Sequence, residues 1–130
     1  MPTFSDASLM KLNTCVPELK ELFTEVVEDF DCTVVCGHRN KADQNKAFDD
    51  GYSKVKWPDG KHNTVPSTAV DVVPYPIDWQ DVDRMRYFAG YVMGLAKAKG
   101  ISLRWGGDWD SDTEVMDNKF QDLVHFEIKD

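Results

Sequence analysis

Apolar residues recur with the period of a helix in the first part of the chain. After Pro17, which suits the first turn of a helix, apolar side chains occur at spacings of three and four residues. This stripe is formed by Leu19, Leu22, Phe23, Val26, Val27 and Phe30. Upstream, Ser5 can cap a shorter helix that ends near Asn13. Packing against a core explains the stripe without any further function.

Further helices are predicted in the middle of the chain. Residues 41–50 have a helical pattern that stops at Gly51. A longer helix is predicted over residues 79–99, with Asp78 as its N-cap and Gly100 at its end. The buried stripe of this longer helix contains Val82, Met85, Phe88, Ala89, Val92 and Leu95.

Short β-rich runs complete the pattern. They occupy residues 32–36, 68–73, 101–105 and 123–129. A segment without periodicity, residues 52–67, precedes the second run, and loops of that length in a compact domain are often functional. The order of elements favours an α+β fold in which helices pack on a small, mainly antiparallel sheet. With a length of 130 residues, we expect one domain that spans residues 1–130.

Composition and charge narrow the classes of function. The chain is 42% hydrophobic and 12% aromatic, which is typical of a globular domain and not of a disordered one. A net charge of −8 argues against binding to nucleic acid, which requires clusters of Lys and Arg. No apolar run approaches the roughly 18 residues of a membrane span, and the N-terminus lacks the pattern of a secretory signal. We expect a monomer that does not insert into membranes.

The chain has three cysteines, of which Cys32 and Cys36 lie in the first β-rich run. Along a strand these residues would be about 13 Å apart, whereas a disulfide needs Cα atoms within about 7 Å. We therefore expect reduced thiols, with Cys32 and Cys36 filling small spaces in the core. A metal site made from this pair is disfavoured, because thiolate ligands usually occur at tighter spacing in turns.

Polar residues interrupt the apolar strands. Asp71 lies within the second run and faces the same side as Ala69, while His125 and Glu127 share one face of the last run. A carboxylate in such a strand is costly to bury unless it is paired or bound to a cation. His62 lies in the long loop that leads to Asp71.

These polar residues allow different interpretations. His62, Asp71 and His125 make a sound zinc set on the sheet face, with two imidazoles, one carboxylate and a fourth position open for water. Spacing alone is weak evidence, because a histidine and an aspartate at this separation occur by chance in many chains. A buried salt bridge, with histidines at the surface, explains the same pattern.

The acidic run Asp108-Trp109-Asp110-Ser111-Asp112 has alternating oxygen donors. It resembles the start of a calcium-binding loop, but it lacks the glycine and the later glutamate of an EF-hand. A solvated acidic loop is one interpretation of this run, and a loosely bound, regulatory Ca²⁺ is the other.

Segments far apart in the chain match the motifs of one group of enzymes in their order and spacing. They are Gly37-His38-Arg39 with Gln44, Lys61-His62 through Asp71 with the following VVPYPIDW, Arg104-Trp105-Gly106-Gly107-Asp108-Trp109, and Asp122-Leu123-Val124-His125. In these motifs the chain resembles the D-Ala-D-Ala carboxypeptidase and L-alanyl-D-glutamate peptidase group of zinc enzymes. The likeness is strongest to small phage endolysins that cleave the L-Ala-D-Glu bond of peptidoglycan stem peptides.

The resemblance implies a role for each polar residue. His62, Asp71 and His125 would be zinc ligands, Asp122 the general base and Arg39 the stabiliser of the oxyanion. In amide hydrolysis, zinc lowers the pKa of a bound water toward roughly 7. A carboxylate then carries the proton to the leaving amine, and a fixed guanidinium stabilises the negative carbonyl oxygen. For Arg39 the alternative is an ordinary salt bridge at a strand end.

Other residues of the motifs are expected to surround the substrate. His38 would shape the substrate wall, because this position is not a ligand in the family, and Gln44 would contact substrate unless it is a solvated polar residue. Glu127 is a rival for the general base, since it shares a strand face with His125, and otherwise it would support that ligand. The chain departs from the family in having Gly60 where a serine is common, and in a longer segment between the first histidine and the aspartate.

The resemblance implies a zinc-dependent peptidase of peptidoglycan that acts in phage-mediated lysis of the host. Without a signal segment, it would be made in the host cytoplasm and reach the wall in the periplasm after a separate protein permeabilises the membrane. A D-Ala-D-Ala carboxypeptidase with the same ligands is an alternative within the family. A non-catalytic wall-binding module with a structural zinc, or a metal-free interaction protein, is the alternative from another class.

Overall fold

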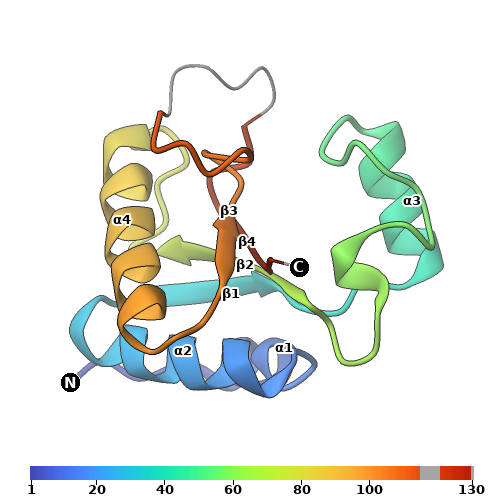
Figure 1. Ribbon diagram of the computed structural model, residues 1–130. Coiled ribbons are helices and arrows are strands. Elements are labelled where there is room, and N and C mark those ends of the chain that lie inside the picture. The colour runs from blue at the N-terminus through green and yellow to red at the C-terminus, as the bar shows by residue number, and fades with distance from the viewer. Residues whose placement is uncertain (115–120, 130) are drawn as a thin grey trace.

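The computed structural model describes residues 1–114 and 121–129. Figure 1 shows the elements in chain order, from the N-terminal helices to the short strands at the end. They are α1 (Asp6–Leu12), α2 (Pro17–Asp29), β1 (Cys32–Cys36), α3 (Lys41–Asp49), the 3₁₀ helix η1 (Lys61–Asn63), β2 (Ala69–Pro74), α4 (Val82–Ala98), β3 (Leu103–Trp105) and β4 (His125–Ile128).

The strands form a single antiparallel sheet of four strands in the order β1-β2-β4-β3. The predicted α+β class with a small antiparallel sheet is therefore confirmed. Strand β4 lies between β2 and β3, although it comes last in the chain. This arrangement places Asp71 of β2 directly opposite His125 of β4.

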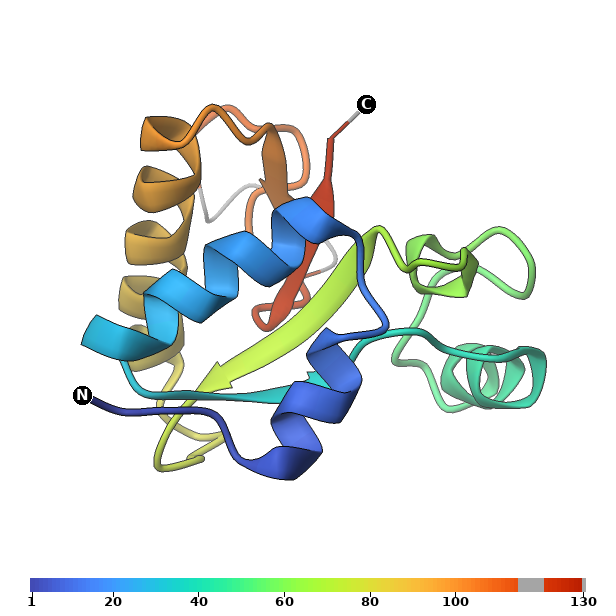
Figure 2. The same ribbon diagram turned by 90° about the horizontal axis from the view of Figure 1, so that it is seen from below.

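One face of the sheet carries the hydrophobic core. Helix α2 runs across this face (Figures 1 and 2). Helix α4 packs against the same core at one end of the molecule, and α3 lies at the other end. The ring of Phe126 on β4 contacts Phe23 of α2 and Phe88 of α4, with ring centroids 5.5 and 6.2 Å apart. Val70 and Val72 of β2 also belong to this core. Because side chains alternate along a strand, Asp71 faces the opposite side of the sheet.

Some predicted boundaries are wrong for identifiable reasons. Helix α4 begins at Val82, because the carboxylate of Asp78 accepts a hydrogen bond from the Gln80 amide at 3.0 Å and forms a turn of its own. Asp81 is the actual N-cap and accepts from the amide of Arg84 at 3.1 Å.

The last strands are shorter than predicted. Strand β4 begins at His125, because Leu123 and Val124 lie in a turn. That turn is closed by the amide of His125, which donates to the carbonyl of Asp122 at 3.1 Å. Strand β3 begins at Leu103 and not at Ile101, and η1 was not predicted within the long loop. Within the described residues, no helix has both the length and the apolar character needed to cross a membrane.

Candidate metal centre

Three buried side chains from different elements meet on the polar face of the sheet. Asp71 and His125 come from neighbouring strands, and His62 comes from η1. The Nε2 atom of His62, the Oδ1 atom of Asp71 and the Nδ1 atom of His125 lie 3.2 Å from one another in each pair. In a tetrahedral zinc site with ligands about 2.0 Å from the metal, two ligand atoms are about 3.3 Å apart. The triangle therefore has the size of one face of such a tetrahedron.

In each imidazole, the hydrogen bond made by the outer nitrogen fixes the direction of the lone pair on the inner nitrogen. Nδ1 of His62 lies 2.8 Å from the carbonyl oxygen of Gly37, and Nε2 of His125 lies 2.8 Å from Oε1 of Glu127. Both partners can only accept, so these nitrogens carry the hydrogens. When the rings are neutral, as metal binding requires, their bare nitrogens point at the Asp71 carboxylate. A cation at this point would satisfy all three atoms, so the donor set fits a divalent metal such as zinc.

The pKa values of the three side chains are shifted because their charges lie close together. Burial tends to raise the pKa of Asp71, but the two histidines lower it well below its usual range. Burial tends to lower the pKa of His62, but the charge of Asp71 raises it to about 10. For His125 the hydrogen bonds to Asp71 and Glu127 likewise outweigh burial and raise the pKa to about 8. Protons and a metal ion therefore compete for the same nitrogens.

Asp122 lies at the edge of this centre, where its carboxylate is close to Asp71 and His125. One ligand atom from each of the three residues lies within 4.8 Å of the others. Burial raises the pKa of Asp122 to about 6, and repulsion from Asp71 adds to the effect. A carboxyl group whose pKa lies near neutrality is suited to general acid–base catalysis.

The backbone of Asp122 is held against a glycine. The amide of Asp122 donates to the carbonyl of Gly106 at 2.9 Å, and the amide of Gly106 donates to the carbonyl of His125 at 2.9 Å. A Cβ atom on Gly106 would collide with the carbonyl oxygen of Asp122. This close approach explains why the motif contains glycine at this position.

Arg39 is fixed beside the same carboxylate. Its Nη2 atom lies 3.4 Å from Oδ2 of Asp71, and its Nη1 atom donates to Oε1 of Gln44 at 3.2 Å. Asp71 thus offers one oxygen to the histidines and the other to the guanidinium. Arg39 lines the cavity beside the histidines, so it contributes a fixed positive charge to that cavity.

Gln44 is fully buried, so the interpretation as a solvated polar residue is wrong. Its Nε2 atom donates to Oγ of Ser53 at 2.9 Å and to the carbonyl of Val55 at 2.7 Å. Its Oε1 atom accepts from Arg39 at 3.2 Å and from Nδ2 of Asn63 at 3.0 Å. These contacts use both hydrogens and both lone pairs of the amide. The geometry therefore gives Gln44 a positioning role, and its direct contact with substrate stays a prediction.

The glycine that replaces the common serine has a steric cause. A Cβ atom on Gly60 would lie 2.6 Å from Oδ1 of Asn63 and 2.9 Å from Oε1 of Gln44. The amide of Gly60 also donates to Oδ1 of Asn63 at 2.8 Å. A serine would displace the buried amides that hold Arg39 in place.

His38 is not brought to the metal centre. Its Nδ1 atom lies 3.1 Å from the carbonyl oxygen of Thr64, and its amide donates to Oγ1 of Thr14 at 2.8 Å. The side chain lines a separate cavity together with Met10 of α1. The predicted contact of His38 with substrate is therefore not supported by its position.

Glu127 supports His125 from behind and does not line the cavity at the candidate metal centre. One carboxylate oxygen lies 2.8 Å from Nε2 of His125, and the other lies 3.6 Å from Nη1 of Arg104, its partner on β3. The side chain is buried and is not among the residues that line the cavity. This position fits the supporting role better than that of the rival base.

Sequence reasoning missed two neighbours of the histidines. The prediction that Cys36 fills the core is wrong, since it is half-buried and its Sγ atom lies 3.9 Å from Nδ1 of His62. Cys36, His62 and Asp71 form a further group whose ligand atoms lie within 4.8 Å. The ring of Trp109 packs against His125, with centroids 5.3 Å apart. The run of aromatic and glycine residues around Trp109 was the available signal.

The other cysteines behave as predicted. Cys32 is buried in the core and its thiol is free, as is that of Cys15. Burial raises the pKa of Cys32 to about 12 and that of Cys15 to about 11. Both side chains therefore remain protonated at neutral pH.

The acidic run forms a cluster next to Trp109. Carboxylate oxygens of Asp108, Asp110 and Asp112 lie within 4.8 Å of one another. Desolvation and the neighbouring carboxyl groups raise the pKa of Asp110. The carboxylate of Asp108 also accepts from the amide of Thr113 at 3.0 Å, which folds the loop back on itself.

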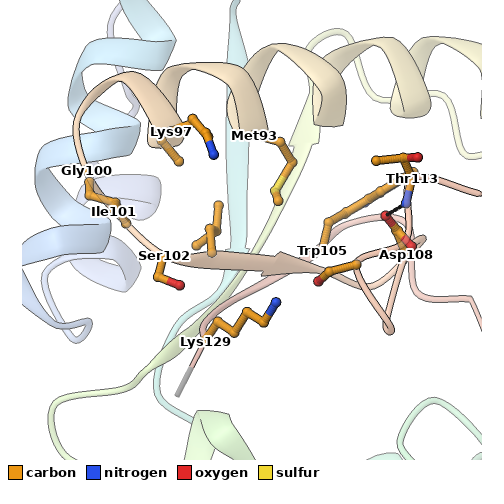
Figure 3. Close-up of a pocket in the computed structure, with 12 residues that line it drawn as sticks. Met93, Lys97, Gly100, Ile101, Ser102, Trp105, Asp108, Thr113 and Lys129 are labelled. Atoms are coloured by element: carbon orange, nitrogen blue, oxygen red, sulfur yellow. Dashed lines mark hydrogen bonds between the residues drawn. The ribbon is translucent and has the colours of Figure 1, made fainter.

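A cavity of about 100 Å³ opens beside the histidines, and a larger one lies elsewhere. The larger cavity, about 570 Å³, lies between α4, β3 and the acidic loop. Figure 3 shows it with Met93, Lys97 and Trp105 around it. Its described lining contains no histidine and no residue of the predicted catalytic set. The smaller cavity is the one lined by His62, His125 and Asp122.

Comparison with known proteins identifies the class of peptidase to which this fold and site belong. The family described as phage L-alanyl-D-glutamate peptidase matches residues 2–129, so the chain belongs to that family. It is 30% identical over 119 residues to the L-alanyl-D-glutamate peptidase of Escherichia phage T5, covering 88% of this chain and 86% of that protein. The crystal structure of the L-Ala D-Glu endopeptidase ChiX from Serratia marcescens superposes with a TM-score of 0.75 at 25% identity, covering 98% of this chain and 90% of that one. The predicted resemblance is confirmed, and the chain is a peptidase.

Replacing Gln44 with leucine should destabilise the fold. The substitution preserves the approximate size of the side chain but removes the oxygen that accepts from both Asn63 and Arg39, and the amide that donates to Ser53 and Val55. We expect the free energy of unfolding to fall by about 2–4 kcal/mol, measured by urea denaturation. The control Gln80→Leu, at an exposed position, should change it by less than about 0.5 kcal/mol. A loss of under about 1 kcal/mol for Gln44→Leu would contradict the role of this amide.

Proposed function

We propose that this chain is a zinc-dependent peptidase that hydrolyses the L-Ala-D-Glu bond of peptidoglycan stem peptides. The observation that carries the proposal is the buried triangle of His62, Asp71 and His125, whose lone pairs converge at the spacing of zinc ligands. Family membership supports the reaction class, and the names of the relatives support the scissile bond.

The residues around the triangle have the positions that amide hydrolysis requires. Zinc held there supplies Lewis acidity, which acidifies water and polarises a carbonyl group. Asp122 accepts the proton of the attacking water and delivers it to the leaving amine. Arg39, held by Asp71 and Gln44, stabilises the negative charge that develops on the carbonyl oxygen. Glu127 keeps His125 in the tautomer and orientation that a ligand needs.

The alternatives predict different pockets or different products. A D-Ala-D-Ala carboxypeptidase would use the same triangle, and the names of the relatives favour L-Ala-D-Glu over it. A wall-binding module with a structural zinc needs neither Asp122 nor Arg39 at the cavity, yet both line it. A metal-free interaction protein would gain nothing from three lone pairs directed at one point.

Family membership supports a biological setting for the protein. We propose that the protein acts in phage-mediated lysis, working as a monomer on the cell wall from the host cytoplasm once the membrane has been permeabilised.

Removing zinc should abolish cleavage reversibly. Chelation by 1,10-phenanthroline should stop the release of fragments from purified peptidoglycan, because water is then no longer acidified at the site. One equivalent of Zn²⁺, added after the chelator has been removed by dialysis, should restore the reaction. Mass spectrometry of the fragments should show new amino termini at D-Glu, whereas loss of terminal D-Ala would favour the carboxypeptidase. Full activity in a sample that elemental analysis shows to be free of metal would exclude the proposal.

Replacing the two carboxylates should separate catalysis from metal binding. We expect Asp122→Asn to lower kcat by about 10²–10⁴-fold while zinc still binds, because the proton carrier is lost. The matched variant Glu127→Gln should weaken zinc binding by about 10–100-fold and keep most of the turnover at saturating zinc. Zinc affinity from competition with a chromogenic chelator, together with initial rates, measures both effects. The opposite pattern would assign the base to Glu127.

The regulatory Ca²⁺ at the acidic run stays a prediction. If Asp108, Asp110 and Asp112 bind the ion, isothermal titration should show heat at millimolar Ca²⁺, and the double variant Asp110→Asn with Asp112→Asn should remove it. The absence of heat in the unmodified protein would leave the solvated loop as the correct interpretation.

A further inference from the structure

The cavity at the metal centre has the opposite balance of charge from the chain as a whole. The chain has 23 acidic and 15 basic side chains. The residues that line this cavity include the basic Arg39, Lys54 and Lys61, and Asp122 is the one acidic member of the described lining. A cleft lined by one sign of charge concentrates the field and raises the local concentration of the opposite charge. The cavity is therefore suited to an anionic group.

The backbone on both sides of Lys54 is held at the cavity by the buried amide of Gln44. The residues on either side of it, Ser53 and Val55, both accept hydrogen bonds from Nε2 of Gln44, at 2.9 and 2.7 Å. Oγ of Ser53 also donates to the carbonyl of Val55 at 3.0 Å. These contacts fix the backbone of an exposed loop at the residue that supplies the charge.

Lys61 is held by a second branch of the same hydrogen-bond network. It lies between Gly60, which is bound to Asn63, and His62 of the metal centre. Nδ2 of Asn63 donates to Oε1 of Gln44 at 3.0 Å, so one amide connects the backbones of both lysines. The carbonyl of Lys61 also accepts from the amide of Thr68 at 3.2 Å. The network thus orders the backbone at both lysines, and both residues line the same wall of the cavity.

We propose that Lys54 and Lys61 form a subsite for the carboxylate of the glutamyl residue on the leaving side of the scissile bond. This inference rests on the proposed function. The nitrogen that receives the proton from Asp122 belongs to that glutamyl residue, and a free carboxylate lies a few bonds from it. Asp122 and both lysines line the same cavity, so the nitrogen and the carboxylate of one glutamyl residue can be bound there together. Arg39 remains with the carbonyl oxygen, because Asp71 and Gln44 hold it.

The test compares two synthetic stem peptides that differ in one group. One contains L-Ala-D-Glu with a free α-carboxylate, and in the other this carboxylate is a carboxamide, as in D-isoglutamine. Because charge-assisted hydrogen bonds are lost, we expect the zinc-loaded protein to cleave the amidated peptide with a kcat/KM about 10–100-fold lower. In the double variant Lys54→Gln with Lys61→Gln, the ratio should fall to within about 3-fold, chiefly through a higher KM for the acidic peptide.

Matched variants separate charge from structure. Lys56→Gln removes a positive charge from the same loop, but this lysine lies over the ring of Phe48, at 5.0 Å, and should leave the ratio unchanged. The double variant Lys54→Arg with Lys61→Arg should retain the preference. Equal cleavage of the two peptides by the unmodified protein would overturn the subsite while leaving the proposed function intact. Cleavage of neither peptide would overturn the proposed function, and the subsite with it.

Discussion

The convergence of His62, Asp71 and His125 is the interaction on which the site depends. Three atoms with lone pairs lie 3.2 Å apart in a buried setting, and such an arrangement is unfavourable unless a cation joins them. A metal ion removes this repulsion, and in its absence protons must do so. The sheet and η1 can bring these side chains together because each is restrained from behind, by Gly37, Arg39 or Glu127.

Different parts of the fold provide these outer contacts. Strand β4 supplies both His125 and its support Glu127, whereas His62 is oriented by a carbonyl from the end of β1. The long loop is ordered mainly by the buried amide of Gln44, which also holds Arg39. A change at Gln44 would therefore disturb both the long loop and Arg39, which contacts the Asp71 carboxylate.

The sequence predicts the sheet and its polar face because alternation along a strand is a local property. It places Asp71, His125 and Glu127 on one side of the sheet, and the structure agrees. The predicted start of α4 was wrong because Asp78 and Asp81 are equally good N-caps by residue type. Only the turn after Asp78 decides between them. Local patterns also cannot show that the amide of Gln44 is buried, since its partners are formed by a loop that has no periodicity.

Strand pairing in this protein has a consequence for how correctly folded molecules can be recognised. Asp71 meets His125 only in the observed alignment of β2 with β4. Sliding one strand by a single residue would turn His125 into the core and bring the Phe126 ring to the polar side. Such a misaligned molecule would keep most of its helices but lose its ligand set. If the triangle binds zinc as proposed, the quantity of zinc retained after refolding would measure the fraction of molecules whose central strands are correctly aligned.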